Sequence, residues 1–297
     1  MGCYTAVNRR KIRLSSVYLP LLTEDHKGNE VRKMRLRISV ATNIGKFRIN
    51  NEDNYYANGK KLTEGVSDDF SVTYTEELTE HALFAVCDGM GGESCGEVAS
   101  ATAVSVLDSF REKIFAAADN KEQSEAVNEY ARTASAAINE EIAKAGGAKG
   151  GTTLTLACVK NGIISMYYLG DSRIYMYRND VLTRLTRDHT VAYEMIDSNV
   201  LTEEEAEKSP DRHRLTMYLG YDDDPSDIKA GFAGSYTLAE GERFLMCTDG
   251  LNEMCTSEEI SAVLSSADTD AAKMLVDKAL ENGGKDNVTC IVIEVVK

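Results

Sequence analysis

Residues 152–170, TTLTLACVKNGIISMYYLG, decide the fold class of this chain of 297 residues. Two apolar runs flank Asn161-Gly162, and this dipeptide is the strongest short-range indication of a two-residue β-hairpin. A second hairpin is predicted in residues 171–185, with its turn near Asn179-Asp180. The two strands of a hairpin run in opposite directions. The sheets of this protein are therefore expected to be antiparallel.

Helices are expected in consecutive pairs. Residues 93–116 and 121–145 follow one another directly, and the second range repeats apolar residues at the spacings of three and four that are typical of an amphipathic helix. Further helices are predicted near residues 257–264 and 268–281. Paired helices together with antiparallel sheets predict an α+β fold rather than a doubly wound parallel sheet.

The chain divides into a basic head and an acidic body. Residues 1–37 hold nine Lys or Arg and only three acids, so residues 1–33 are interpreted as a basic, partly ordered extension. Residues 34–42, MRLRISVAT, place apolar side chains at every second position, which is the period of a half-buried strand. Residues 34–297 are therefore expected to form one strand-rich domain.

The composition argues against several classes of protein. The formal net charge of −15 disfavours a nucleic-acid binder, because such proteins neutralise phosphates with basic residues. A phosphorylated ligand would instead need cations to meet this acidic chain. No run approaches the roughly 18 apolar residues of a membrane span, and the head has no long apolar core of a secretory signal.

The cysteine and histidine patterns leave oxygen as the expected metal ligand. The seven cysteines form no C-x-x-C pair, and four lie in apolar runs, which predicts buried thiols in a reducing cytoplasm. The histidines show no metal-binding spacing, so each is interpreted as an ordinary surface or structural residue. These histidines are His26, His81, His189 and His213.

Three carboxylates stand at the ends of predicted strands. Two segments, LFAVCDGMGG (83–92) and RFLMCTDGL (243–251), each run an apolar strand into an Asp-Gly pair, at Asp88 and Asp249. A third segment places Asp286 directly before the last strand. If these strands are antiparallel neighbours, the three carboxylates meet at one edge of a sheet. Two further acids, Glu52 and Asp53, precede a short aromatic run and are expected to reach the same edge.

Such a cluster of acids predicts a metal site. Neighbouring carboxylates repel one another unless hard cations lie between them. Oxygen ligands favour Mg²⁺, Mn²⁺ or Ca²⁺ over zinc, and Gly89 would offer an unobstructed backbone carbonyl. Two such ions, about 3.5 to 4 Å apart, can generate a hydroxide that hydrolyses a phosphate ester. Arg48 is suited to bind the remaining phosphate oxygens, because a guanidinium can donate two parallel N–H hydrogen bonds to them.

Each motif also has a plainer interpretation. A single Asp-Gly pair is usually a turn, and an isolated Arg48 would most often be a solvated surface residue. The DGMGG segment resembles a nucleotide-binding loop, but Ser94 stands where the third glycine of that pattern belongs. The coincidence of three aspartates at strand ends favours the metal site.

Eight motifs, in order over residues 38–297, resemble the metal-dependent protein serine/threonine phosphatases of type 2C, the PPM family, and particularly their compact bacterial members. The motifs are ATNIGKFRINNED, FAVCDGMGG, GGTTLTL, YYLGDSRIY, LTRDHT, LGY, LMCTDGL and GGKDNVT. The resemblance implies a central β-sandwich flanked by helix pairs, a four-layer α-β-β-α arrangement. It also implies two Mn²⁺ or Mg²⁺ ions and metal-dependent hydrolysis of phosphoserine and phosphothreonine in proteins.

The resemblance assigns roles to individual residues. Asp88 would bridge the two metals, the Gly89 carbonyl would complete one of them, and Asp249 and Asp286 would hold the other. Arg48 would grip the phosphate. The family acids that match Glu52 and Asp53 bind metal directly or through water. The implied protein is a monomeric cytoplasmic phosphatase that acts on phosphorylated proteins and opposes a Ser/Thr kinase.

Other positions depart from the family pattern or lie outside the chemistry. Met90 stands where eukaryotic relatives have a histidine proposed as general acid, so protonation of the leaving group falls to water. Asp171, in the GDSR motif, is expected to organise a turn. Residues 188–213 match the family's variable flap, which implies a role in substrate selection or product release rather than in the chemistry.

A third metal site is doubtful. Residues 142–151 contain no acid where many bacterial members have a third-metal aspartate, although Glu140, Glu141 or a water-mediated contact could substitute. Two alternative functions also stand beside the phosphoprotein phosphatase. One is a catalytically silent relative that binds phosphoproteins or regulates a partner. The other is a phosphatase that uses the same site on small molecules or in anti-sigma-type signalling.

Overall fold

The Asn161-Gly162 hairpin forms as predicted. Asn161 and Gly162 have φ values of 52° and 74°, both in the left-handed region that a type I′ turn requires. They join β8 (Leu154–Lys160) to β9 (Ile163–Leu169). The computed structural model describes residues 35–62, 69–77, 81–91, 95–147, 149–220 and 225–296. The basic extension predicted for residues 1–33 lies outside these ranges.

Two antiparallel sheets of six strands each form the centre of the domain. The strand order is β11-β10-β13-β14-β1-β4 in the first sheet and β12-β9-β8-β5-β2-β3 in the second. A small third sheet pairs β6 (Gly89–Gly91) with β7 (Gly150–Thr152). The remaining strands are β1 (Arg35–Asn43), β2 (Asn54–Ala57), β3 (Lys60–Lys61), β4 (Asp69–Glu77), β5 (His81–Cys87), β10 (Arg173–Arg178), β11 (Val181–Arg184), β12 (Gly231–Thr237), β13 (Arg243–Cys247) and β14 (Val288–Val296).

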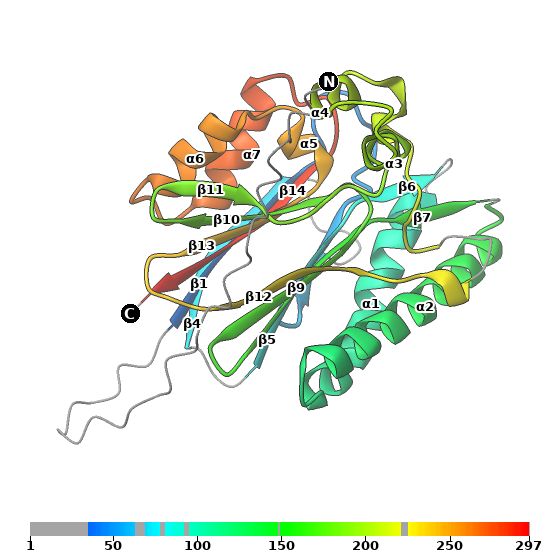
Figure 1. Ribbon diagram of the computed structural model, residues 1–297, viewed down its shortest axis with the longest axis horizontal. Helices are drawn as coiled ribbons and strands as arrows, with labels where there is room; N and C mark the ends of the chain where they lie inside the picture. Colours follow the sequence, from blue (N-terminus) through cyan, green and yellow to red (C-terminus); the bar gives the residue numbers. More distant parts are fainter. Residues whose placement is uncertain are drawn as a thin grey trace, which may run out of the picture. The chain divides into compact units, whose positions relative to one another are not determined.

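Helix pairs cover the two outer faces of this sandwich (Figure 1). The pair α1 (Cys95–Ala116) and α2 (Asn120–Lys144) packs on the second sheet. The pair α6 (Ser257–Ser265) and α7 (Ala271–Glu281) packs on the first. These helices agree with the predicted ranges to within three residues, and the predicted four-layer α-β-β-α arrangement is confirmed.

Side chains at the helix starts explain where two of these helices begin. The Asp119 carboxylate accepts a hydrogen bond from the Glu122 backbone at 2.9 Å and so caps α2. At the start of α6, Thr256 and Glu259 each bind the other's backbone amide, at 3.3 and 3.0 Å. Such caps satisfy amide groups that have no partner within the helix itself.

The two sheets pack face to face through a continuous apolar core. Phe84 and Met166 from the second sheet meet Phe244 and Ile291 from the first, and all four are fully buried. The strand β1 is more buried than predicted, because residues 38–42 are all buried rather than every second one. The inner face of β1 joins this core, while α7 packs on its outer face. The prediction of a half-buried strand was therefore wrong.

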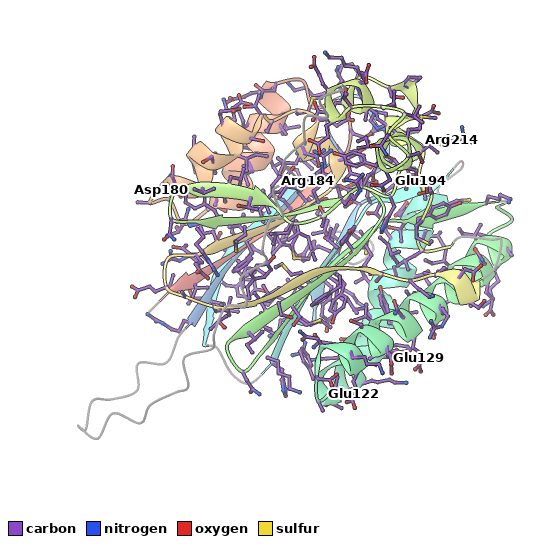
Figure 2. The ribbon with its side chains drawn as sticks, viewed as in Figure 1. Glu122, Glu129, Asp180, Arg184, Glu194 and Arg214 are labelled. Atoms are coloured by element: carbon purple, nitrogen blue, oxygen red, sulfur yellow. The ribbon has the colours of Figure 1, made fainter. Side chains whose placement is uncertain are left out.

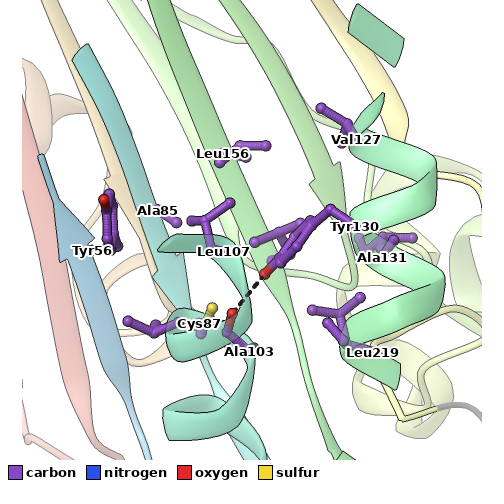
Figure 3. Close-up of a cluster of buried hydrophobic side chains, with 14 of the residues drawn as sticks. Tyr56, Ala85, Cys87, Ala103, Leu107, Val127, Tyr130, Ala131, Leu156 and Leu219 are labelled. Atoms are coloured by element: carbon purple, nitrogen blue, oxygen red, sulfur yellow. Dashed lines mark hydrogen bonds between the residues drawn. The ribbon is translucent and has the colours of Figure 1, made fainter. Parts of the chain in front are cut away.

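The helix pair α1–α2 has its own core against the second sheet (Figure 3). Leu107 and Tyr130 point from the two helices toward Leu156 and Ala85 of the sheet, and all of them are fully buried. The Tyr130 hydroxyl donates a hydrogen bond to the Ala103 carbonyl at 3.1 Å, which satisfies its one buried polar group. This core fixes the position of α1 relative to the strands of the second sheet.

Short helices fill the segment between β11 and β12, which includes the predicted flap of residues 188–213. These are α3 (Val191–Asp197), α4 (Glu203–Glu207), and the 3₁₀ turns η1 (Pro210–His213) and η2 (Pro225–Asp227). Residues near the two ends of the flap pair with each other. The Val191 amide donates to the Arg214 carbonyl at 2.9 Å, and the Thr216 amide donates to the His189 carbonyl at 2.9 Å. The turn η1 is thereby brought back beside the first residues of this segment.

Replacing Leu107 by alanine tests the packing of the helix pair. We expect Leu107→Ala to lower the free energy of unfolding by about 2 to 5 kcal/mol, because it opens a cavity in a fully buried cluster. The control Val181→Ala changes a side chain that is 59% exposed, and its effect should stay within about 0.5 kcal/mol. Urea unfolding followed by circular dichroism measures both, and equal small effects would contradict the packing described.

Candidate metal centre

The pairing of β13 with β14 brings Asp249 and Asp286 together. Cys247, the last residue of β13, lies opposite Cys290 near the start of β14. Asp249 follows β13 by two residues and Asp286 precedes β14 by two, so both carboxylates lie at the same end of the first sheet. This part of the predicted convergence is confirmed.

Asp88 reaches the same place from the other sheet. It follows β5, which belongs to the second sheet, so the prediction that all three strands are neighbours in one sheet was wrong. Because the two sheets pack face to face, strand ends from both open into one cavity of about 420 Å³. Its lining includes the predicted residues Arg48, Glu52, Asp88, Gly89, Asp249 and Asp286. The sandwich, rather than a single sheet edge, assembles the acids.

The backbone of Asp88 is held by the GTT motif. Its amide donates to the Thr153 hydroxyl at 2.9 Å, and its carbonyl accepts from the Thr153 amide and the Thr152 hydroxyl, each at 2.9 Å. The Thr153 hydroxyl also forms a hydrogen bond of 2.7 Å with that of Ser172, in the GDSR motif. Three motifs distant in the sequence therefore fix one residue, and the Asp88 carboxylate takes no part in holding it.

Gly89 is required by the close approach of two backbones. A Cβ atom at this position would lie 2.2 Å from the Gly96 carbonyl oxygen and 2.4 Å from that of Glu52, so a larger residue would displace the chain. The Gly89 amide donates to the same Glu52 carbonyl at 3.2 Å. The glycine thus keeps the start of β6 against the loop that carries Glu52.

Asn287, which sequence reasoning did not single out, organises the loop of residues 44–52. Its side-chain amide donates to the backbone carbonyls of Ile44 and Asn50, at 2.9 and 3.0 Å. Its carbonyl accepts from the Glu52 amide at 2.9 Å. An asparagine supplies both donors and an acceptor, so this one side chain can hold two ends of a loop. The sequence feature that could have identified Asn287 is its position directly after Asp286 in the motif GGKDNVT.

Arg48 stands at the mouth of the cavity. Its guanidinium donates to the Asp286 carboxylate at 2.5 Å, and 51% of its side chain remains exposed. A guanidinium has five N–H donors, so this ion pair leaves several of them free for an anion entering from solvent. The position agrees with the predicted phosphate contact, which stays a prediction.

The charges of the cavity indicate that a cation belongs there. Burial, followed by the nearby charges of Asp53 and Asp249, raises the pKa of Asp88 well above its ordinary value. Burial likewise raises the pKa of Asp53 to about 8. Carboxylates whose charged forms are this disfavoured become stable as anions when a cation lies beside them. Burial also raises the pKa of Glu52, although Arg48 partly offsets that effect.

Asp53 supplies a second sign of a missing partner. This residue is only 3% exposed and is not among the residues that line the cavity. One carboxylate oxygen accepts from the Thr248 hydroxyl at 2.9 Å, whereas the other is buried without a hydrogen-bond partner among the described residues. Buried polar atoms are nearly always paired in native proteins. The site residues therefore fit a divalent cation with oxygen ligands.

Two residues join the site although sequence reasoning gave them other roles. One ligand atom each from Asp171, His213 and Asp249 lie within 4.8 Å of one another. His213, interpreted from the sequence as an ordinary surface or structural residue, has an exposed side chain that contacts Asp249 and Glu253 at the cavity. Asp171 likewise lines the cavity instead of only organising a turn. Their places in the predicted flap and in the GDSR motif were the available signals.

The suggested substitutes for a third-metal acid do not reach the site. Glu140 and Glu141 both pair with Lys144, at 2.8 Å each, on the surface of α2. Neither residue lines the cavity that holds Asp88. Met90 does line it, and a thioether offers no proton for a leaving group.

The start of the flap segment is anchored to the first sheet. The buried Asp188 carboxylate accepts from Arg173 at 2.8 Å and also pairs with Arg184. Arg184, labelled in Figure 2, donates to the Tyr193 hydroxyl at 2.6 Å and so ties β11 to α3. His189 is structural, as predicted, because its Nδ1 accepts from the Gly170 amide at 3.2 Å. These contacts fix the segment whose far end carries His213.

The prediction of buried, unpaired thiols finds support in the described ranges. The six cysteines within them are all free and buried, as expected for apolar thiols. In the same ranges, no helix has the length and apolar character needed to cross a membrane.

Comparison with known proteins places this site in a family. Residues 64–282 match the family model described as Protein phosphatase 2C. The chain is 30% identical over 271 residues to serine/threonine protein phosphatase PstP of Mycobacterium tuberculosis, covering 88% of this chain and 45% of that protein. It is 29% identical over 262 residues to serine/threonine phosphatase stp of Listeria innocua, covering 85% of this chain and 93% of that protein. The chain thus spans less than half of the mycobacterial relative.

A solved structure shares the fold. The catalytic domain of PstP, in complex with two manganese ions, matches with a TM-score of 0.68 at 27% identity, covering 89% of this chain and 100% of that one. The family model, which spans most of the sequence, and this likeness of fold agree with the arrangement of the acidic cavity. The chain belongs to the protein phosphatase 2C family.

Proposed function

We propose that residues 34–297 form a metal-dependent phosphatase domain that hydrolyses phosphoserine and phosphothreonine in proteins. The observation that carries the proposal is the single cavity that brings Arg48 together with Asp88, Asp249 and Asp286. The names of the relatives, serine/threonine phosphatases, support the same substrates. The two manganese ions of the PstP structure support Mn²⁺ or Mg²⁺ as the cofactor, with two ions bound.

The carboxylates divide into direct and supporting ligands. Asp88 would contact both ions, the Gly89 carbonyl would complete one, and Asp249 and Asp286 would hold the other. Asp53, which has a buried, unpaired oxygen, and Glu52 would bind metal directly or through water. Bound there, the ions would supply Lewis-acid activation of water and of the phosphate.

The protein's own residues would hold the substrate. The exposed guanidinium of Arg48 would bind the phosphate oxygens, and its ion pair with Asp286 fixes its direction. The Asp88 backbone, clamped by Thr152 and Thr153, would keep the bridging carboxylate in position without rearrangement. Met90 offers no proton at the cavity wall, so the leaving group would take its proton from water.

The retained side chains favour an enzyme over a catalytically silent binder. Each acid needed for the metals, and the arginine for the phosphate, lies at the cavity. We further infer a monomeric signalling enzyme in the cytoplasm, opposed to a Ser/Thr kinase. The free, buried cysteines fit such a reducing compartment.

Removing one bridging charge tests the enzyme directly. We expect Asp88→Asn to lower Mn²⁺-dependent phosphate release from a phosphothreonine peptide on the order of 10³-fold, because several kcal/mol of metal stabilisation are lost. Adding a chelator to the native protein should have a similar effect. The control Asp180→Asn alters an acid in the β10–β11 turn and should leave the rate unchanged. A native protein with no metal-dependent release would contradict the proposal.

The clamp on Asp88 predicts a positioning role for Thr153. Thr153→Val keeps the shape of the side chain but removes the hydroxyl that binds Asp88 and Ser172. We expect a loss of about 10- to 100-fold in Mn²⁺ affinity, as for other residues that orient metal ligands. Isothermal titration with Mn²⁺ measures the affinity. The control is Thr183→Val, on the exposed face of β11, and equal affinities in the two variants would argue against the clamp.

A further inference from the structure

Two large apolar side chains stand in solvent on either side of Arg48. Phe47 is 72% exposed and Ile49 is 91% exposed, the two highest values among the large apolar residues that the structure describes. Neither belongs to an apolar core of these residues. The other four exposed large apolar residues in the described ranges occur singly in the sequence. Single residues of that kind are ordinary, whereas a pair that flanks the proposed phosphate contact indicates a binding surface.

The loop that carries Phe47 and Ile49, the apolar pair, is held on both sides. Directly before the pair, the Lys46 amide donates to the Gly284 carbonyl at 2.7 Å. Directly after it, the Asn50 carbonyl accepts from the Asn287 side chain at 3.0 Å. A fixed loop loses little conformational freedom when a partner binds, and this favours affinity. The pair is therefore presented to solvent by a rigid part of the fold.

The position of the apolar pair fits a residue close to the phosphorylated one. Consecutive Cα atoms are about 3.8 Å apart, so Phe47 and Ile49 each lie one such step from Arg48. A peptide in an extended conformation advances by about 3.3 Å per residue. When Arg48 holds the phosphate, the residues one or two positions away in the peptide are therefore within reach of the pair.

The exposed area is too small for a stable contact between two copies of the chain. Two side chains of this size and exposure offer on the order of 300 Å², whereas a stable interface buries about 1,200 to 2,000 Å². A short peptide that is already held through its phosphate needs much less additional contact. The area therefore favours a substrate peptide as the occupant.

We propose that Phe47 and Ile49 form a docking surface for an apolar side chain of the phosphoprotein, one or two residues from the phosphorylated serine or threonine. The inference rests on the proposed function, because Arg48 must hold the phosphate for its neighbours to reach the surface. Apolar contact is present equally in the bound substrate and in the transition state, so it lowers KM and leaves kcat unchanged. The surface selects among phosphoproteins and takes no part in the chemistry.

Two matched phosphothreonine peptides test the surface. One carries leucine at the two positions on each side of the phosphothreonine, and the other carries serine there. We expect the native full chain with Mn²⁺ to favour the leucine peptide by about 10-fold in kcat/KM, through KM, because a large apolar side chain leaves water. The double variant Phe47→Ser, Ile49→Ser should lose this preference. Equal kcat/KM values in the native protein, or an undiminished preference in the double variant, would overturn the inference.

The ratio of the two peptides cancels any general change at the metal centre, because both carry the same phosphothreonine. The control Val181→Ser removes a side chain on β11 that is 59% exposed, and it should keep the preference. Phe47→Leu, which retains an apolar side chain, should keep most of it. A double variant with a lower kcat for both peptides and an unchanged ratio would show that the pair only positions Arg48, and this would overturn the docking role.

Sedimentation at several protein concentrations tests the alternative occupant. The docking surface predicts the same sedimentation coefficient for the native protein and the double variant. A dimer that forms in the native protein and is lost in the double variant would assign the pair to a contact between two copies of the chain, and the inference would fall.

Peptides that cannot be hydrolysed separate this inference from the proposed function. In them a phosphonate with a P–C bond replaces the phosphate ester, and fluorescence anisotropy measures their affinity for the protein with Mn²⁺. Suppose that the native protein binds the leucine phosphonate about 10-fold more tightly than the serine phosphonate, that the double variant does not, and that no phosphothreonine peptide is hydrolysed. The proposed function would then fall and the surface would stand. A native protein that hydrolyses both phosphothreonine peptides equally well would remove the surface alone.

Discussion

Mutual repulsion among buried carboxylates is the constraint on which this structure depends. The sandwich collects Asp53, Asp88 and Asp171 at one end, away from water, and the pKa of each is raised by burial and by neighbouring charges. Apolar packing between the two sheets forces these strand ends together whether or not the charges are balanced. A protein can keep such a cluster when a ligand of opposite charge binds it, and so the same residues that weaken the fold define its site.

Hydrogen bonds to the backbone leave the acidic side chains free for that ligand. Thr153 holds Asp88, and Asn287 holds the loop that carries Glu52, so neither carboxylate is used as structural support. This division explains why short motifs recur beside the acids. The motif residues position the chain, and the acids supply the charge. Loss of a positioning residue is therefore expected to act through the metal rather than through the fold.

The flap segment is anchored to the first sheet at its start, and its end contacts an acid of the cavity. Asp188 pairs with two arginines of the first sheet, which anchors the start of the segment on a rigid element. Its end returns through η1 and places His213 3.8 Å from Asp249. The segment that matches the family's flap thus places a side chain beside the acids of the cavity.

The sequence by itself determined the local elements and the main acids. Asn161-Gly162 specifies its turn because both residues accept positive φ, and the apolar spacing of α2 specifies a helix face within one segment. Asp249 and Asp286 could also be paired in advance, since adjacent antiparallel strands bring their ends together. Only the tertiary structure decided that β5 lies in the opposite sheet and that His213 folds back onto Asp249. Those contacts depend on packing between segments far apart in the chain, which no local periodicity or turn preference encodes.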